Sequence, residues 1–345
     1  MKISMQLTRK TQWGLALAIA AAVSLWTPNA SAAEPILSYD PAKIVANEAE
    51  NCSQCHARSV QAWTQSTHKV TYDELHQREE AKTILTDLGM SGSIRRNDEC
   101  VQCHYTQHAE GGGEPKTIMG ISCQRCHGAA VDWLAIHQDV KGRPDRAARL
   151  AEAAQHGMRL TDKIYELATS CYRCHTVPRE DLVNKGHHKA GSDFELVAWS
   201  QGEIRHNFLP LPDEAQNKEA PAEERRLLYV IGKLLDMEYT LRGLAVATAE
   251  GDFLTAMGER ANRVLGDLKG MGVSGVAEID AAVKAVPSDG GAVKVAAGNE
   301  AEYLAAADAI STSAKAFEAK KDSYASNLAA VDSKLPTEYK GKAFE

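Results

Sequence analysis

The chain has 345 residues, of which 44% are hydrophobic and 25% charged, and its formal net charge at pH 7 is −7. An acidic surface of this kind argues against nucleic acid and anionic lipid as partners. It suits docking to a basic patch on another protein, although acidic surfaces are common among soluble proteins.

The first 32 residues have the pattern of a secretory signal peptide. Basic residues precede an apolar run from Trp13 to Trp26, and Ala30-Ser31-Ala32 then offers an A-x-A cleavage site. The alternative is a retained membrane anchor, but the run is shorter than the ~20 residues that a spanning helix needs. We therefore expect cleavage after Ala32, export to the periplasm, and a soluble mature protein without a membrane span.

All eight cysteines belong to Cys-x-x-Cys pairs, and a histidine directly follows each pair. The cysteines are Cys52, Cys55, Cys100, Cys103, Cys123, Cys126, Cys171 and Cys174, and the histidines are His56, His104, His127 and His175. This pattern is the attachment signature of c-type haem. The two thiols form thioether bonds to the vinyl groups of one porphyrin, and the adjacent histidine binds the iron from one face. The sequence therefore predicts four covalently bound haems.

Two other uses of these cysteines have to be compared with haem attachment. Cys100 to Cys126 has the C-x2-C-x19-C-x2-C spacing of a zinc ribbon. Eight cysteines could also form disulfides in an exported protein. Neither alternative requires a histidine after the second cysteine. Histidine fills 12 of 345 positions, so four such successions would arise by chance with a probability of roughly one in a million.

Residues 33–210 are predicted to form a tetrahaem cytochrome domain, because all four motifs lie between Cys52 and His175. Apolar side chains are sparse in this region, so the porphyrins must supply much of the buried apolar surface. We expect short helices and long loops around packed haems. Gly111-Gly112-Gly113 predicts a flexible loop, and a proline-rich stretch at 209–213 separates this region from the next.

Residues 211–345 are predicted to form an α-helical domain. Apolar residues from Leu227 to Leu244 recur at helical spacing on a segment that Pro221 opens. Further helices are expected over 252–269, over 276–286 and from about 300 to 328, with a loop at 288–291. Such helices pack into a small bundle, which offers a surface for a homodimer. The predicted fold class is therefore mainly α.

Eight histidines remain for the second axial position of each haem iron. They are His68, His76, His108, His137, His156, His187, His188 and His206. Two histidine ligands give a six-coordinate iron that transfers electrons, whereas an empty position gives an iron that binds small ligands. The choice among these histidines therefore decides the function.

Further patterns surround the motifs. Trp63 and Thr67-His68 follow the first motif, Cys-Ser-Gln-Cys-His, and Glu99 precedes the second. Gly120-Ile121-Ser122 precedes the third motif, His137 lies ten residues after it, and a basic helical spacer precedes the fourth. Over residues 45–206, this order resembles the tetrahaem cytochrome c-554 family of nitrifying bacteria.

The resemblance implies which histidines bind the irons from the distal side. It assigns His68 to the fourth haem and His137 to the first. A histidine well beyond the fourth motif binds the third haem in the family. His206 fits this role best, in a stretch from Trp199 that we expect to be helical, and His187 or His188 is the alternative.

The second haem has no distal protein ligand in the family, so the resemblance leaves His104 as the sole axial residue there. The residues keep other outcomes open, because this site could also be closed by His156, His76, His108 or Met119. The C-terminal region departs from the family, whose typical members are shorter. The partners implied are redox proteins, with a hydroxylamine oxidoreductase-like donor and a membrane quinone-linked cytochrome as the two candidates.

Two functions compete. Closely spaced haems form a chain along which electrons hop, which predicts a periplasmic electron carrier without catalytic residues. The alternative is an enzyme that acts on a small nitrogen oxyspecies at an open second haem. The Cys-x-x-Cys-Lys motif of pentahaem nitrite reductases is absent, and so are the eight haems of hydroxylamine oxidoreductase. The electron carrier is therefore the favoured prediction.

Overall fold

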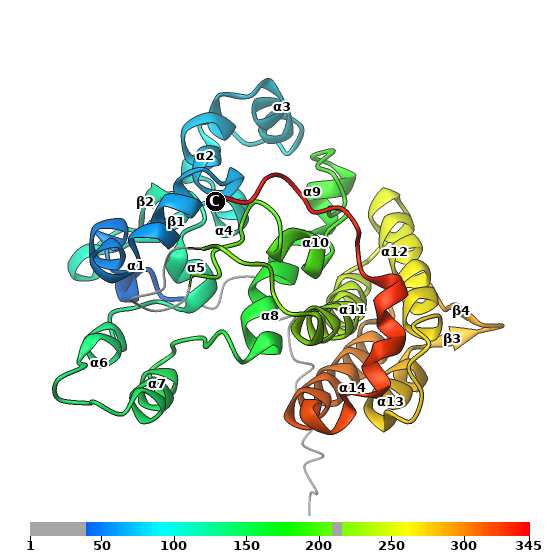
Figure 1. The fold of residues 1–345 in the computed structure, drawn as a ribbon. Helices are drawn as coiled ribbons and strands as arrows, with labels where there is room; N and C mark the ends of the chain where they lie inside the picture. Colours follow the sequence, from blue (N-terminus) through cyan, green and yellow to red (C-terminus); the bar gives the residue numbers. More distant parts are fainter. Residues whose placement is uncertain (1–38, 209–215) are drawn as a thin grey trace, which may run out of the picture. The chain divides into compact units, whose positions relative to one another are not determined.

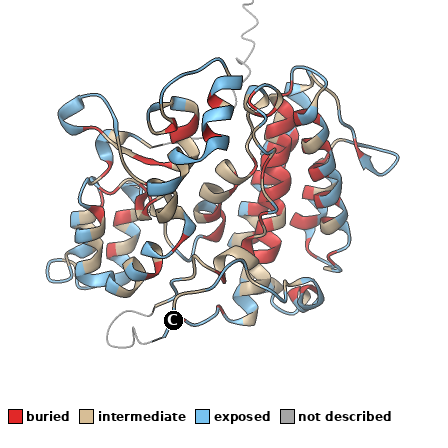
Figure 2. Cartoon of the chain, turned by 90° about the horizontal axis from the view of Figure 1, so that it is seen from above, coloured by how far each residue is buried: buried red, intermediate tan, exposed pale blue. Residues whose placement is uncertain are grey.

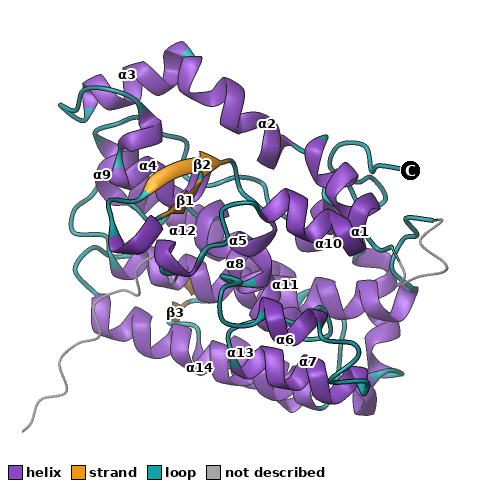
Figure 3. Cartoon of the chain, turned by 90° about the vertical axis from the view of Figure 1, so that its left-hand side faces the viewer, coloured by secondary structure: helices purple, strands orange, loops and turns teal. Residues whose placement is uncertain are grey.

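In the part of the chain that the structure describes, helices dominate and the strands form two short hairpins (Figure 3). The computed structural model describes residues 39–208 and 216–345. The signal peptide predicted for residues 1–32 and the proline-rich stretch at 209–213 lie outside these described residues. Within them, no helix is long and apolar enough to cross a membrane.

The first part of the chain consists of short helices joined by turns and loops (Figure 1). They are α1 (Glu48–Thr64), α2 (Thr67–Glu74), α3 (Glu79–Asp87), α4 (Asp98–His104), α5 (Cys123–His127), α6 (Leu134–Gln138), α7 (Arg146–Gln155), α8 (Ile164–His175), α9 (Glu180–Asn184) and α10 (Leu196–Ser200). Strands β1 (Thr106–His108) and β2 (Lys116–Met119) pair antiparallel between α4 and α5, with Thr106 opposite Met119.

The second part contains longer helices that pack against one another. They are α11 (Ala222–Ala245), α12 (Asp252–Lys269), α13 (Ala277–Ala285) and α14 (Glu300–Ala319), and α11 contacts both α12 and α14. A small hairpin of β3 (Ser288–Asp289) and β4 (Ala292–Val293) follows α13. The predicted class, mainly α with short helices before a helical bundle, is confirmed.

In the second part of the chain, three of the predicted helices are present, and two further predictions about secondary structure need correction. The helices predicted for 252–269, for 276–286 and after Pro221 are present as α12, α13 and α11. The helix predicted to run to about residue 328 ends at Ala319, because Lys320 donates its N–H to Phe317 in a tighter 3₁₀ bond. The expected loop at 288–291 lies within the β3–β4 hairpin.

Two local predictions concern the first part. Gly111 and Gly112 lie in the 3₁₀ turn Glu110–Gly112, within the connection between β1 and β2, and both have positive φ. The stretch from Trp199 to His206 is not helical throughout, since α10 ends at Ser200. The reason is that Glu203 donates its backbone N–H to Lys340, in the C-terminal tail, instead of continuing the helix.

The apolar core is concentrated in the second half of the chain. One large cluster extends from Ile164 to Val331, whereas the residues before it form two small clusters around Tyr105 and around Trp133. Figure 2 shows the buried residues (red) gathered along the longest helix, α11. The region that carries the first three motifs therefore has little core of its own, as its composition suggests.

Helix α8, which carries the fourth motif, belongs to the large core. Tyr172 is fully buried there, and α8 packs against α11. On the neighbouring helices, Arg260 Nε donates to Asp236 at 2.6 Å, and both side chains are at most 7% exposed. Arg260 also donates to the carbonyl of Ser192 at 3.0 Å. The bundle is thereby tied to the segment that follows the fourth motif.

The buried ion pair yields a test of this connection. Asp236→Ala should lower the free energy of unfolding by about 3 kcal/mol or more, because it leaves the buried guanidinium of Arg260 without its carboxylate partner on α11. Chemical denaturation of the haem-loaded protein measures the loss. The control is Lys294→Ala, which breaks a largely exposed pair with Glu302 and should cost less than about 1 kcal/mol. Equal losses would contradict the role given to the buried pair.

Candidate haem-binding sites

Each Cys-x-x-Cys-His motif is folded as a helical turn. Helices α4, α5 and α8 all end at the motif histidine, and helical geometry inside α1 is interrupted at His56. Residues three and four positions apart share one face of a helix. The two cysteines and the histidine of a motif therefore point to the same side, which is the arrangement that one porphyrin requires.

Each motif histidine faces one histidine from elsewhere in the chain. The ring centroids are 6.1 Å apart for His56 and His137, 6.2 Å for His104 and His188, 6.1 Å for His127 and His206, and 6.3 Å for His68 and His175. All twelve histidines of the sequence lie in the described residues. The four pairs use eight of them, and no histidine is shared between pairs.

The separation within the pairs is the one expected across an iron. A metal–imidazole bond of about 2.0 Å and a ring radius of about 1.1 Å place the centroids of two trans imidazoles about 6.2 Å apart. An ordinary aromatic contact can fall anywhere between about 4.5 and 7 Å. Four pairs that agree to within 0.2 Å, between 6.1 and 6.3 Å, point instead to one shared geometric requirement.

The second ring nitrogen is engaged in several of these histidines. His188 Nδ1 donates to the carbonyl of Lys189 at 2.8 Å, and His206 Nδ1 donates to that of Ile204 at 2.7 Å. His175 Nδ1 is hydrogen-bonded to Ser192 Oγ at 2.9 Å. Metal-binding histidines usually donate their other nitrogen in this way. In His188 and His206 the carbonyl acceptor fixes the proton on Nδ1, so that Nε2 keeps its lone pair.

Burial keeps three of the motif histidines neutral, namely His104, His127 and His175. Removal from water lowers the pKa of His104 and that of His127 to about 4, and the pKa of His175 to about 3; the facing histidine or a nearby positive charge contributes less. Burial also lowers the pKa of His68 and of His137. Neutral imidazole is the form that binds a metal. These five rings are thus in the right protonation state at neutral pH.

Four histidines lie outside the pairs. His108, on β1, has its Nδ1 hydrogen-bonded to the carbonyl of Ile44 at 2.7 Å. His156 and His187 are exposed, at the end of α7 and after α9. His76 lies in a 3₁₀ turn after α2. Among the described residues, none of these rings stacks on or faces another histidine ring.

The residues that carried the family resemblance hold His68 in place. Trp63 Nε1 donates to the carbonyl of Ile121 at 2.8 Å, and the N–H of Ile121 donates to the carbonyl of His68 at 3.1 Å. A Cβ at Gly120 would overlap the carbonyl oxygen of His68. The tryptophan after the first motif and the glycine before the third therefore act together to position a ring opposite the fourth motif's histidine.

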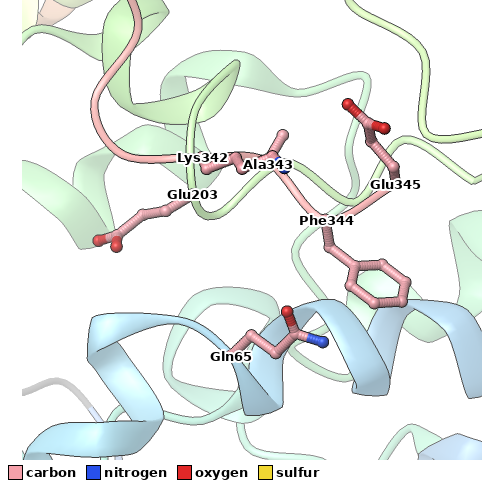
Figure 4. A pocket seen from close by; sticks show the side chains of 6 residues that line it. All are labelled: Gln65, Glu203, Lys342, Ala343, Phe344 and Glu345. Atoms are coloured by element: carbon pink, nitrogen blue, oxygen red, sulfur yellow. The ribbon is translucent and has the colours of Figure 1, made fainter.

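The C-terminal tail holds the segment that carries His206. Lys340 donates its N–H to Ala198 and accepts from that of Glu203, both at 2.8 Å. Asn217 Nδ2 donates at 2.7 Å to the carbonyls of Arg205 and Phe344. The tail also forms a pocket against the end of α1 (Figure 4), lined by Gln65, Glu203, Lys342, Ala343, Phe344 and Glu345.

Thiols of different motifs are adjacent. Cys52 and Cys123 are hydrogen-bonded to each other, and so are Cys103 and Cys174. Cys126 lies near Cys174. All eight cysteines are free thiols in the structure. Among the described residues, no three His, Cys, Asp or Glu side chains form a group that could hold a metal ion.

Buried donors without partners surround the histidine pairs. Tyr105 Oη, Trp133 Nε1, His137 Nδ1 and Arg260 Nη2 are buried without a hydrogen-bond partner in the described part of the chain. Buried polar atoms are normally hydrogen-bonded. Each of these residues lies beside a pair: Tyr105 follows His104, Trp133 packs on His137, and Arg260 bonds the residue that holds His175. Haem propionates are acceptors that would satisfy such donors, so the sites fit haem.

Attachment motifs that each face a second imidazole define a c-type cytochrome, a protein with covalently bound haem. The family model described as "Cytochrome c554 and c-prime" matches residues 51–128, which carry the first three motifs. The resemblance predicted from the motifs is confirmed over these residues. No curated protein and no solved structure matches the chain.

Three of the four histidine pairs in the structure are the ones that the family resemblance implies, and the fourth pair is not implied by it. His137, His206 and His68 face His56, His127 and His175, respectively. His188, considered earlier only as an alternative for the third haem, faces His104 of the second motif. No local pattern signals this pairing, because the two residues are neighbours only through the fold.

The close approach at Gly120 generates a test of the His68 position. Gly120→Ala should displace His68 from His175, and with haem on the fourth motif it should convert one low-spin iron to high spin. Electron paramagnetic resonance of the oxidised protein measures the change. Gly266→Ala is the matched control, because a Cβ there meets nothing within 4 Å. An unchanged low-spin spectrum in Gly120→Ala would show that this glycine does not position the ring.

Proposed function

We propose that this chain is an exported, periplasmic tetrahaem cytochrome that transfers electrons between redox partner proteins. The observation that carries the proposal is the set of four facing histidine pairs, each with one motif histidine and a ring separation of 6.1–6.3 Å. Covalent haem supplies a one-electron couple between ferric and ferrous iron. Two histidine ligands hold both states in nearly the same geometry, so that little rearrangement accompanies each transfer.

The contacts between motifs suggest the order of the electron path. Cys52 of the first motif touches Cys123 of the third, and Cys103 of the second touches Cys174 of the fourth. Helix α5, with the third motif, packs against α8, with the fourth. In the haem-loaded protein these sulfurs would be thioethers, which cannot donate hydrogen bonds to each other. The short distances between the motifs would remain. The motifs therefore form a row in the order first, third, fourth, second.

Redox proteins are the proposed donors and acceptors. The net charge of −7 suits partners with a basic docking surface. The resemblance supports a hydroxylamine oxidoreductase-like donor or a membrane quinone-linked cytochrome, and the helical region supplies a surface for a homodimer. The alternative function, catalysis at an open second haem, requires a free face opposite His104. His188 lies at that face, so the geometry favours the electron carrier.

The haem number is tested by mass. The mature protein from a host with the haem attachment machinery should gain the mass of four haems. Cys123→Ala with Cys126→Ala should gain three, because only the third motif loses its thioether bonds. A wild-type protein with fewer than four haems would contradict the proposal.

The ligand assignment at the third motif has its own test. His206→Ala should convert one iron to high spin, since His127 then has no facing ring. The spectrum of the oxidised protein reports this loss. His156→Ala serves as the control, because His156 is exposed and faces no other histidine among the described residues. If His206→Ala leaves all low-spin signals unchanged, the assignment is wrong.

A further inference from the structure

We propose that His188 is the distal ligand of the haem on Cys100 and Cys103, so that the second iron is closed on both faces. The inference rests on the proposed function for haem attachment at this motif, and it goes beyond it by assigning the one axial position that the family leaves vacant. It makes all four irons six-coordinate. Four observations carry it.

The first observation is the geometry of the pair. The rings of His104 and His188 have centroids 6.2 Å apart and planes inclined by 49°. The three other pairs span 6.1–6.3 Å, with inclinations from 23° to 90°. The second motif is therefore indistinguishable in ring separation from the three motifs whose partners the resemblance supplies.

The second observation concerns the nitrogen that would bind. His188 Nδ1 donates to the carbonyl of Lys189 at 2.8 Å, and a carbonyl can only accept. The proton is thereby fixed on Nδ1, and Nε2 has the lone pair that a metal needs. His206 has the same arrangement, with Ile204 as its acceptor at 2.7 Å.

The third observation is a direct tie between the two segments that carry the rings. Arg179, immediately before α9, donates to Gln102 Oε1 at 2.6 Å and pairs with Glu99 at 3.4 Å. Both partners lie on α4, within the turn that ends at His104. Helix α9, which His188 follows, is thus fixed to the second motif itself. The segment that carries His188 is therefore anchored to the second motif.

The fourth observation is the turn after α9. His187 has a φ of 54°, and it is one of two non-glycine residues with positive φ among the described residues. This conformation is costly for a side chain with a Cβ. The N–H of His188 then donates to the carbonyl of Leu182 at 3.0 Å. The left-handed residue reverses the chain, and the bond to Leu182 fixes His188 where its ring meets His104.

The other candidates for this position lie elsewhere. In the described residues, the rings that approach His104 are His188 and its own neighbour Tyr105. His108, on β1, is hydrogen-bonded to the carbonyl of Ile44, and His156 is exposed at the end of α7. Met119 lies on β2 opposite Thr106. His188 is the histidine that the fold places opposite His104.

The experiment compares wild-type protein with His188→Ala and with His156→Ala, a control that removes an exposed ring facing no other histidine among the described residues. Wild-type protein and His156→Ala should show only low-spin ferric iron, and the reduced proteins should bind no carbon monoxide. His188→Ala should show one high-spin iron and bind one carbon monoxide per chain. Haem number, measured by mass on the same samples, should stay at four.

Each departure has a defined meaning. A high-spin iron in the wild type, or an unchanged spectrum in His188→Ala with four haems present, overturns the assignment of His188. A wild-type protein with fewer haems instead overturns the proposed function. His188→Met provides a second test in case the alanine variant does not assemble. It should keep a low-spin iron and raise the reduction potential of one haem, whereas an unchanged potential counts against His188 as a ligand.

Discussion

The structure depends on holding two imidazole rings about 6.2 Å apart at each motif, which is the separation that two ligands on opposite sides of one iron would need. This requirement recurs at each motif, and each time the second ring comes from a distant part of the chain. One ring is fixed by a helical turn, because the motif itself sets it. The other has to be positioned by the fold, and several local features of the protein serve that purpose.

The contacts that position the second histidine differ from pair to pair. His68 is positioned by Gly120 and by the bond chain from Trp63. His188 depends on Arg179 and on the left-handed His187. His206 lies in a non-helical segment that the C-terminal tail holds. These devices are hydrogen bonds and close backbone contacts. The residues before Ile164, a stretch that includes His68, form only small apolar clusters.

The helical bundle supplies the apolar core that this region lacks. Helix α8 belongs to both, since it carries the fourth motif and buries Tyr172 against α11. The buried pair of Asp236 and Arg260 extends the connection to Ser192, whose hydroxyl bonds His175. The bundle therefore supports the fourth motif directly, because α8 packs on α11. It supports the third motif indirectly, because α5 packs on α8. This gives the C-terminal region a structural role in a protein whose redox groups lie elsewhere.

The sequence by itself determined the chemistry of attachment. A cysteine, a second cysteine three residues on and the histidine after it share a face on any helical turn, so the four motifs needed no tertiary information. Helical periodicity likewise predicted α11, α12 and α13. Where tertiary contacts override local preference, the predictions failed: α14 ends early at a 3₁₀ bond, and Lys340 of the C-terminal tail takes the N–H of Glu203 that would have extended α10. The partner of His104 was decided only by the tertiary structure, because the tie from Arg179 to α4 and the turn at His187 bring together residues that no local pattern connects.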